Sequence, residues 1–150
     1  MIEINNLTSQ KIDEKFLKNI CQKVLEKEKR KECQLSIAII GPARIRQLNK
    51  KYLGKNRATD VLSFPELKNF KVGESVKNLG EIVICPREVK KNAKRFDSPF
   101  EKELARVLIH GILHLLGYDH EKSPKIGVKK ENYYLSRTFR NIYPEISKES

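Results

Sequence analysis

Four short segments of the chain have the hydrophobic pattern of β-strands. In IEIN, apolar and polar residues alternate, which places every second side chain on one face of a strand. QLSIAII is rich in β-branched residues and stops at a glycine–proline pair, which is typical of a buried strand. DVLSFP is ended by proline, and GEIVIC is a further apolar run. The predicted strands cover residues 2–5, 34–40, 60–65 and 80–85.

Apolar residues elsewhere recur at the spacing of helix faces. Residues three or four apart lie on one side of a helix, and that side packs on a core. The stripes are Ile12, Phe16, Ile20 and Val24 in a helix to about Arg30; Ile45, Leu48 and Tyr52; Val89, Ala93 and Phe96 after Pro86; Phe100, Leu104, Val107 and Leu108; and Tyr134, Leu135, Phe139 and Ile142 before Pro144. EKSPKIGVKK, before the last stripe, is expected to be a basic loop.

These strands and helices follow one another without strict alternation, so the predicted fold class is α+β. The chain has 150 residues, which is enough for one packed core and few for two. We expect a single domain over residues 1–150, in which a small mixed four-stranded sheet packs with about five helices.

The helix that begins near residue 99 has the clearest start signal in the chain. Ser98 is a candidate N-cap, Pro99 suits the first helical position, and Glu101 stands where it could reach back to the N-cap. Nothing interrupts this helix until Gly117, which can take the left-handed conformation that ends helices.

All three histidines of the chain lie near the end of this helix, in HGILHLLGYDH. His110 and His114 are four residues apart, so they project from one helix face with about 5–6 Å between their Cβ atoms. A reversal at Gly117 could bring His120 back to that face. Three imidazoles leave one tetrahedral position for water, as in a catalytic zinc site. Nickel, cobalt and manganese are alternatives to zinc.

A metal site of this kind predicts hydrolysis, because a divalent ion lowers the pKa of its bound water toward about 7. The histidine spacing also matches that of metzincin peptidases, H-E-x-x-H-x-x-G-x-x-H. Those enzymes carry a general-base glutamate where this chain has Gly111, which cannot accept a proton. A metallopeptidase is therefore an alternative that the sequence weakens.

The composition favours polyanionic partners. Lys and Arg number 31 against 19 Asp and Glu, which gives a net charge of +12 and a sequence pI of about 9.7. Such a charge favours RNA, DNA or an anionic membrane surface. The hydrophobic fraction of 39% is ordinary for a folded protein and excludes a disordered chain.

The longest apolar stretch, VLIHGILHLLGY, is too short to span a membrane and contains two histidines. MIEINNLTSQ lacks the basic segment and apolar run of a signal peptide. Cys21, Cys33 and Cys85 are far apart and lack a CxxC spacing, so we expect buried thiols rather than disulfides or a cysteine metal site. We therefore expect a cytoplasmic protein.

Three motifs together resemble those of the YbeY family of metal-dependent endoribonucleases, the rRNA maturation factors. HGILHLLGYDH is similar at every specified position to the family's H-G-x-L-H-L-x-G-Y-D-H. LNKKYLGKNRATDVLSFP at 48–65 resembles L-N-x-x-Y-R…T-D/N-V-L-S-F-P, and LGEIVIC at 79–85 resembles L-G-D-I-V-I. The resemblance extends from about residue 34 to residue 120.

The resemblance implies an α+β fold with a zincin-like helix, in which His110, His114 and His120 bind one Zn²⁺ together with a water. It implies cleavage of single-stranded RNA, with roles in 16S rRNA 3′-end processing and ribosome quality control. The partners it implies are single-stranded rRNA, the small ribosomal subunit and an Era-type GTPase, and we expect no membrane partner.

The middle motif departs from the family at one position. Family members commonly have arginine directly after the motif's tyrosine, where it helps to hold or activate the RNA, and this chain has Leu53. Arg57 is the nearest guanidinium and is a candidate for this catalytic and phosphate-binding role, with Lys51 and Lys55 beside it. A solvated loop charge is an equal alternative for Arg57.

Two residues close to the histidines are further candidates. Arg106 lies one turn before His110 and could contact a phosphate, although a partly exposed helix arginine is the commoner case. Asp119 is a candidate for the catalytic site because it could orient one imidazole, or it could equally cap the turn. The sequence assigns no general base and no oligomeric state.

A ribosome-assembly factor that contains zinc but does not catalyse is the alternative from another functional class. Leu53, in place of the family's arginine, favours it. The leading hypothesis remains a zinc-dependent endoribonuclease that acts on rRNA.

Overall fold

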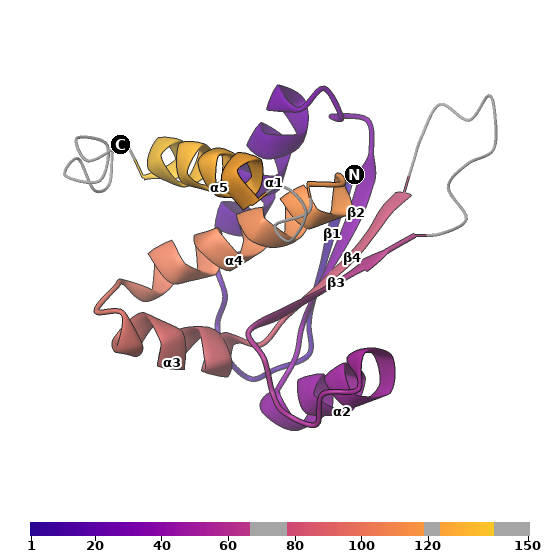
Figure 1. The fold of residues 1–150 in the computed structure, drawn as a ribbon, viewed down its shortest axis with the longest axis vertical. Helices are drawn as coiled ribbons and strands as arrows, with labels where there is room; N and C mark the ends of the chain where they lie inside the picture. The colour runs from indigo at the N-terminus through magenta and orange to yellow at the C-terminus, as the bar shows by residue number, and fades with distance from the viewer. Residues whose placement is uncertain (67–77, 119–123, 140–150) are drawn as a thin grey trace.

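A computed structural model describes residues 1–66, 78–118 and 124–139, and these form a four-stranded sheet and five helices (Figure 1). The sheet order is β1-β2-β4-β3, with β1, β2 and β4 parallel and β3 antiparallel to β4 at one edge. The strands are β1 (Ile2–Asn6), β2 (Gln34–Ile39), β3 (Val61–Pro65) and β4 (Asn78–Ile84). The predicted α+β class and mixed four-stranded sheet are confirmed.

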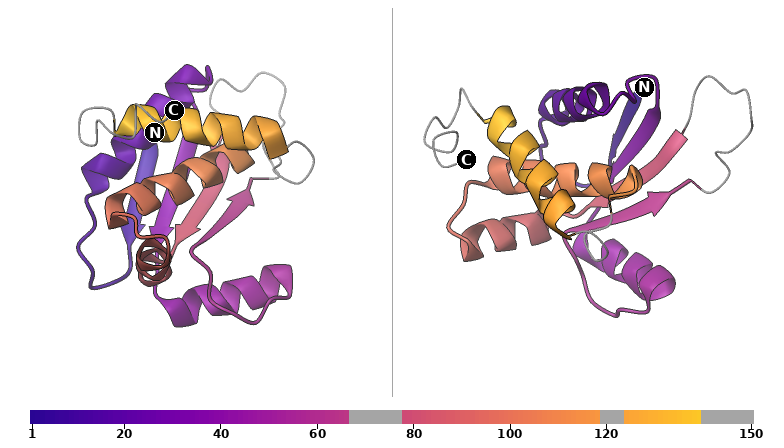
Figure 2. Two further views of the ribbon diagram at one scale, coloured as in Figure 1. Left: turned by 60° about the vertical axis from the view of Figure 1, so that its left-hand side comes forward. Right: turned by 45° about the horizontal axis from the view of Figure 1, so that its top comes forward.

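The helices form layers on the two faces of the sheet (Figure 1 and Figure 2). α1 and α4 cover one face, α3 and α5 pack against α4, and α2 lies on the opposite face. The helices are α1 (Glu14–Lys27), α2 (Pro42–Leu53), α3 (Pro86–Arg95), α4 (Phe100–Leu115) and α5 (Pro124–Thr138).

The two-residue period of the strands divides the core into two clusters. In β4, Ile82 and Ile84 point to the side of α1 and α4, whereas Val83 points to the side of α2. The smaller cluster joins Val83 to Ile45 of α2 and Leu62 of β3. β4 is therefore buried on both faces, which explains its continuous apolar sequence.

The three cysteines are buried thiols, and none of them forms a disulfide. Burial raises the pKa of the Cys21 thiol to about 12. The prediction of buried thiols is confirmed.

α4 is the helix around which the larger core is built. Nine of its residues are buried. Gly111 lies where the helix approaches the sheet most closely: a Cβ there would be 3.2 Å from Cδ1 and Cγ2 of Ile82 and from Oγ of Ser63. A glycine at this position allows the helix to pack directly on β3 and β4.

No helix in the described parts of the chain is long and apolar enough to cross a membrane.

Two predicted helix boundaries are wrong. The N-cap of α4 is Pro99 rather than Ser98, because Pro99 has an extended ψ of 145° and its carbonyl accepts from the Glu103 N–H. Ser98 is one position too early to cap, and no side chain caps α4. α5 begins at Pro124, so most of the expected basic loop is helical. Proline suits a first helical turn, and the buried side of α5 extends back to Gly127.

The stripes predicted for α2 and α3 each end in an exposed aromatic residue. Tyr52 is 56% exposed and Phe96 is 60% exposed, whereas Ile45 and Val89 at the starts of the same stripes are fully buried. Both aromatic residues lie at the C-terminal ends of their helices, past the partners on which those helices pack. Helical periodicity assigns a residue to a face but does not say where the covering element ends.

Gly111→Ala should destabilise the protein, although alanine favours a helix more than glycine does. Ile82 is fully buried and would have to shift, so we expect a net loss of up to about 2 kcal/mol in the free energy of unfolding, the overpacking cost less the gain in helix propensity. Urea denaturation measures the loss.

Ile82→Val removes Cδ1, one of the three close atoms. The cost of Gly111→Ala should therefore be smaller in an Ile82→Val background. An equal or larger cost in that background would contradict the packing explanation.

Candidate active site

The C-terminal half of α4 presents two of the three histidines. His110 is half-buried and His114 is exposed, and they lie one turn apart on α4. The turn after α4 follows the predicted geometry. Gly117 has a φ of +99° and donates to the His114 carbonyl at 3.1 Å, and the Tyr118 N–H donates to the Leu113 carbonyl at 3.0 Å. These two bonds form a Schellman motif that ends the helix at Leu115, one residue after His114.

His110 is held by a carboxylate from a different helix. Its Nδ1 lies 2.8 Å from Oε1 of Glu131, a buried residue of α5. A carboxylate at this position accepts the hydrogen bond of an Nδ1–H, and in that tautomer Nε2 carries the lone pair. The contact therefore orients the His110 ring so that Nε2 is the nitrogen that can bind a ligand.

Arg106 connects Glu131 to a second buried carboxylate. Its guanidinium binds both oxygens of Glu103, with Nε 3.1 Å from Oε2, and its Nη1 lies 3.9 Å from Oε2 of Glu131. The hydrogen bond with Glu103 is the main cause that raises the pKa of Arg106. Arg106 thus supports the residue that holds His110. The phosphate contact predicted for Arg106 stays a prediction.

A second polar cluster anchors the chain where it leaves α4. Glu28, at the end of α1, accepts hydrogen bonds from the hydroxyls of Tyr118, at 2.7 Å, and of Tyr134. Lys130 donates to the same carboxylate at 3.1 Å, and its Nζ lies 4.8 Å from the centroid of the Tyr118 ring. The cluster joins α1 and α5 to the residue that follows the Schellman turn.

Opposing effects act on the Glu28 carboxyl group. Burial alone would raise its pKa, but the hydrogen bonds from Tyr134, Tyr118 and Lys130 together lower it below the usual value. Burial and the contact with Glu28 raise the pKa of the Tyr134 hydroxyl, which therefore stays a donor.

The predicted phosphate-binding residues lie on the other side of the sheet. Lys51 is in α2, Lys55 and Arg57 are in the loop after it, and all three are exposed. α2 and α4 cover opposite faces, so these residues are not placed beside His110 (Figure 2). The loop is ordered by Asn49, a residue 2% exposed whose side chain donates to the Arg57 carbonyl at 2.9 Å.

Arg57 lines a shallow pocket of about 420 Å³ at the start of α2. The other described residues of this pocket are Pro42, Ala43, Arg46, Asn56 and Ala58. Two guanidinium groups therefore lie in one open concavity, an arrangement that could bind phosphate.

Asp119 and His120 lie outside the described residues. Within residues 1–66, 78–118 and 124–139, no group of three or more histidine, cysteine, aspartate or glutamate side chains is arranged to hold a metal ion. The described part of the predicted ligand set consists of His110 and His114.

Comparisons with known proteins identify the family. A family model described as Endoribonuclease YbeY matches residues 3–136, most of the chain. The chain belongs to the YbeY family of endoribonucleases. Relatives named Endoribonuclease YbeY include one from Thermotoga maritima, 38% identical over 130 residues, which cover 83% of this chain and 82% of the relative. One from Syntrophotalea carbinolica is 34% identical over 146 residues, 97% of each chain.

A more similar but shorter match is to Endoribonuclease YbeY of Thermodesulfovibrio yellowstonii, 51% identical over 89 residues, 59% of this chain and 55% of that one. The fold is similar to the solution structure of TM1509 from Thermotoga maritima, with a TM-score of 0.67 and 33% identity over 100% of this chain and 97% of that chain. The resemblance to YbeY proteins predicted from three motifs is thus confirmed.

The enzyme class predicted from the sequence, an endoribonuclease, is the class of the YbeY family. The packing of Gly111 also disfavours the metallopeptidase alternative. Position 111 points at Ile82 and Ser63, where not even a Cβ fits without displacement. The glutamate of metzincin peptidases would have no room at this position of the YbeY helix.

Glu131 is the residue of the site that the sequence-based prediction missed. It comes directly after the segment expected to be a basic loop, 21 positions after His110. Helical spacing was the signal that could have found it, because Gly127, Glu131 and Leu135 are each four residues apart on the buried side of α5. A single carboxylate on an apolar stripe calls for a buried partner.

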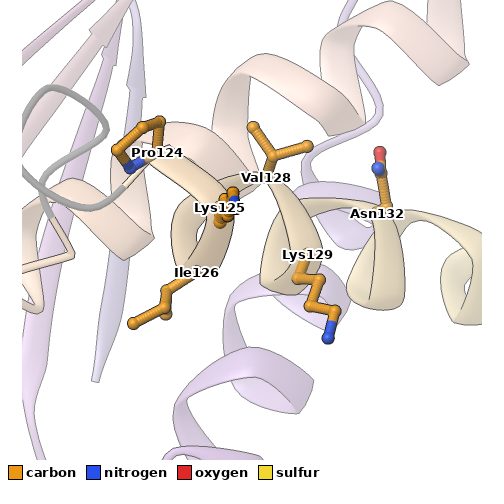
Figure 3. A pocket seen from close by; sticks show the side chains of 6 residues that line it. All are labelled: Pro124, Lys125, Ile126, Val128, Lys129 and Asn132. Atoms are coloured by element: carbon orange, nitrogen blue, oxygen red, sulfur yellow. The ribbon is translucent and has the colours of Figure 1, made fainter.

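α5 also lines a second surface feature, shown in Figure 3. An open pocket of about 560 Å³ is lined by Pro124, Lys125, Ile126, Val128, Lys129 and Asn132. No described site residue lines it, so it is separate from the side of α5 that holds His110.

Glu28→Gln should change the dependence of stability on pH. Because the folded protein lowers the pKa of Glu28, the carboxylate stabilises the fold above the usual glutamate pKa of about 4.3, and this contribution is lost as the pH falls through the lower folded pKa. We expect Glu28→Gln to cost about 1–3 kcal/mol at neutral pH. The difference from wild type should shrink below about pH 4.

Urea denaturation over a pH series tests this expectation. Glu26→Gln is the matched control, because Glu26 is exposed at the same end of α1. A constant difference between Glu28→Gln and wild type at all pH values would rule out the carboxylate's charge as the cause.

Proposed function

We propose that the protein is a zinc-dependent endoribonuclease that hydrolyses phosphodiester bonds of single-stranded rRNA. The observation that carries the proposal is the 2.8 Å contact between His110 Nδ1 and Glu131 Oε1, on a helix that presents His114 one turn later. The proposed ligands are His110, His114 and His120, with water in the fourth position.

The described residues fit a metal site in their chemistry. Imidazoles that bind metals commonly donate their other N–H to a carboxylate, which fixes the ring and raises its basicity. Glu131 supplies this carboxylate to His110, and Arg106 and Glu103 hold Glu131 from behind. Zinc held by these residues would lower the pKa of a bound water and polarise a phosphoryl oxygen, which is the chemistry that phosphodiester hydrolysis requires.

The protein's own charges act before the reaction. A net charge of +12 concentrates a polyanion at the surface, and Lys51, Lys55 and Arg57 are exposed for contacts to the RNA backbone. Leu53 cannot bind phosphate. We propose that Arg57 takes over the role of the family's arginine. Asp119 is proposed to orient one imidazole of the site.

We further propose that the substrate is the 3′ end of 16S rRNA and that the enzyme acts in the cytoplasm on the small ribosomal subunit, with an Era-type GTPase as a partner. The resemblance of its motifs to those of rRNA maturation factors supports this substrate. A non-catalytic assembly factor is the second candidate, and it is favoured by the exposed Leu53 in place of arginine.

His114→Ala should remove cleavage while leaving the fold intact, because His114 is exposed. Loss of a direct metal ligand should cost more activity than the roughly 10- to 100-fold typical for loss of an outer partner. The measurement is cleavage of a single-stranded rRNA fragment, with metal analysis of each purified protein. Lys102→Ala on the same helix is the control. Equal and negligible cleavage by wild type and His114→Ala would favour the assembly factor.

Glu131→Ala should weaken zinc binding about 10- to 100-fold, because His110 loses the group that orients it. Glu131→Gln keeps an acceptor but loses the charge, so its effect should be smaller. Competition with a chromophoric chelator measures the affinity independently of activity. Glu101→Ala changes an exposed acid of α4, the helix that carries His110, and should leave the zinc affinity unchanged. Unchanged zinc affinity in Glu131→Ala would contradict the proposed role.

A further inference from the structure

An aromatic pair lies exposed at the end of α2. Tyr52, predicted to be buried, is 56% exposed. Its ring packs edge-on against Phe64 of β3, with centroids 5.2 Å apart and an interplanar angle of 65°. Tyr52 is therefore supported by another ring while the residue as a whole stays exposed to solvent. A supported, solvent-facing ring is what a nucleobase requires for stacking.

The chain segment that carries this ring is uniformly basic. Residues 41–58 contain six Lys or Arg and no Asp or Glu, which is half of the net charge of +12. The six are Arg44, Arg46, Lys50, Lys51, Lys55 and Arg57, and all are exposed. None of them forms an ion pair with another described residue. The charge is thus available to phosphates.

Lys51 is the cation closest to the ring, with its Nζ 5.3 Å from the Tyr52 centroid. A base stacked on Tyr52 would bring its phosphate within reach of this lysine. An aromatic ring in a basic surface that tracks the backbone is the usual combination in proteins that bind single-stranded nucleic acid.

The aromatic pair is connected to the candidate active site through β3. Phe64 follows Ser63 in this edge strand, and Ser63 Oγ lies 3.2 Å from the position of a Cβ on Gly111, the neighbour of His110. Successive residues of a strand point to opposite faces, so Ser63 faces α4 while Phe64 faces α2. An RNA strand that crosses the edge of the sheet at β3 would reach both sites.

A second exposed aromatic residue, Phe96, lacks two of the features of Tyr52. Phe96 is 60% exposed and lies beside Arg95, whose Cζ is 5.6 Å from its ring centroid. It follows α3, where Glu88 forms an ion pair with Lys91, and no other aromatic ring of the described residues packs against it. Phe96 therefore has exposure and a cation but lacks both the supporting ring and the connection to β3.

We propose that Tyr52, supported by Phe64 and flanked by Lys51, is a stacking platform for an unpaired base of the RNA substrate. This inference rests on the proposed function and extends it, because it assigns a base-binding residue on the face of the sheet opposite α4. Tyr52 is a positioning residue: it binds the RNA strand away from the bond that is cut.

Binding of two oligonucleotides by the zinc-loaded protein tests the platform. One is a labelled single-stranded 2′-O-methyl RNA of about ten nucleotides, and the other has the same phosphates but abasic sugars. Tyr52→Ala should weaken binding of the first about 5- to 100-fold, the usual effect of losing one base–aromatic stack. The same variant should bind the abasic oligonucleotide as wild type does. Tyr52→Trp should restore the binding.

Salt dependence separates stacking from charge. Lys51→Gln should reduce the slope of log affinity against log salt by about 0.7, the value for one phosphate contact on a single strand. Tyr52→Ala should leave this slope unchanged, and in cleavage assays it should raise KM with little effect on kcat. Phe96→Ala is the matched control and should behave as wild type in every assay.

The platform is overturned if Tyr52→Ala binds the RNA as tightly as wild type does, loses equal affinity for the abasic oligonucleotide, or is matched by Phe96→Ala. These outcomes are distinct from a failure of the proposed function. RNA cleavage that depends on His114 but not on Tyr52 would remove the platform alone. Binding that depends on Tyr52, in a protein that does not cleave RNA, would remove the catalytic proposal alone.

Discussion

The close approach of α4 to the sheet at Gly111 is the constraint on which the rest of the structure depends. Ser63 and Ile82 are paired neighbours in the β3–β4 ladder, and both would touch a Cβ at this position. Only a residue without a side chain lets the helix lie directly over this pair. His110 precedes this contact in the chain and is therefore positioned by it. The same contact leaves no room for the glutamate of metzincin peptidases, so packing and chemistry disfavour that activity together.

A line of alternating charges then connects the histidine to the interior. Glu103, Arg106, Glu131 and His110 lie in sequence along the interface between α4 and α5. Buried charges of this kind add little net stability when they are paired, but removing one partner costs about 3–5 kcal/mol because it leaves the other uncompensated. Their value here lies in geometry. They hold one ring nitrogen of His110 against Glu131 and so decide which nitrogen faces outward.

The edge strand β3 joins two surfaces of different chemistry. The face toward α4 carries the histidines and the buried carboxylates, whereas the face toward α2 carries exposed cations and the Tyr52–Phe64 pair. A single-stranded polyanion needs charge and aromatic rings for affinity, and it needs ordered polar groups for hydrolysis. In the proposed function, binding and hydrolysis are separated on opposite faces, so that the cations remain solvated without disturbing the charges behind His110.

Much of this structure could be predicted from near neighbours in the sequence. Strand runs, the apolar stripe of α4, the glycine turn and the four-residue spacing of His110 and His114 all depend on residues within one or two turns of each other. Tertiary structure decided the rest. Glu131 contacts His110 although 21 positions separate them in the sequence. Arg106 binds two carboxylates. Tyr52 is exposed although Ile45, the first residue of its apolar stripe, is buried. The periodicity of a helix predicts which side of it is buried. The length and position of elements distant in the sequence decide which residues pack on that side and how far along the helix the packing extends.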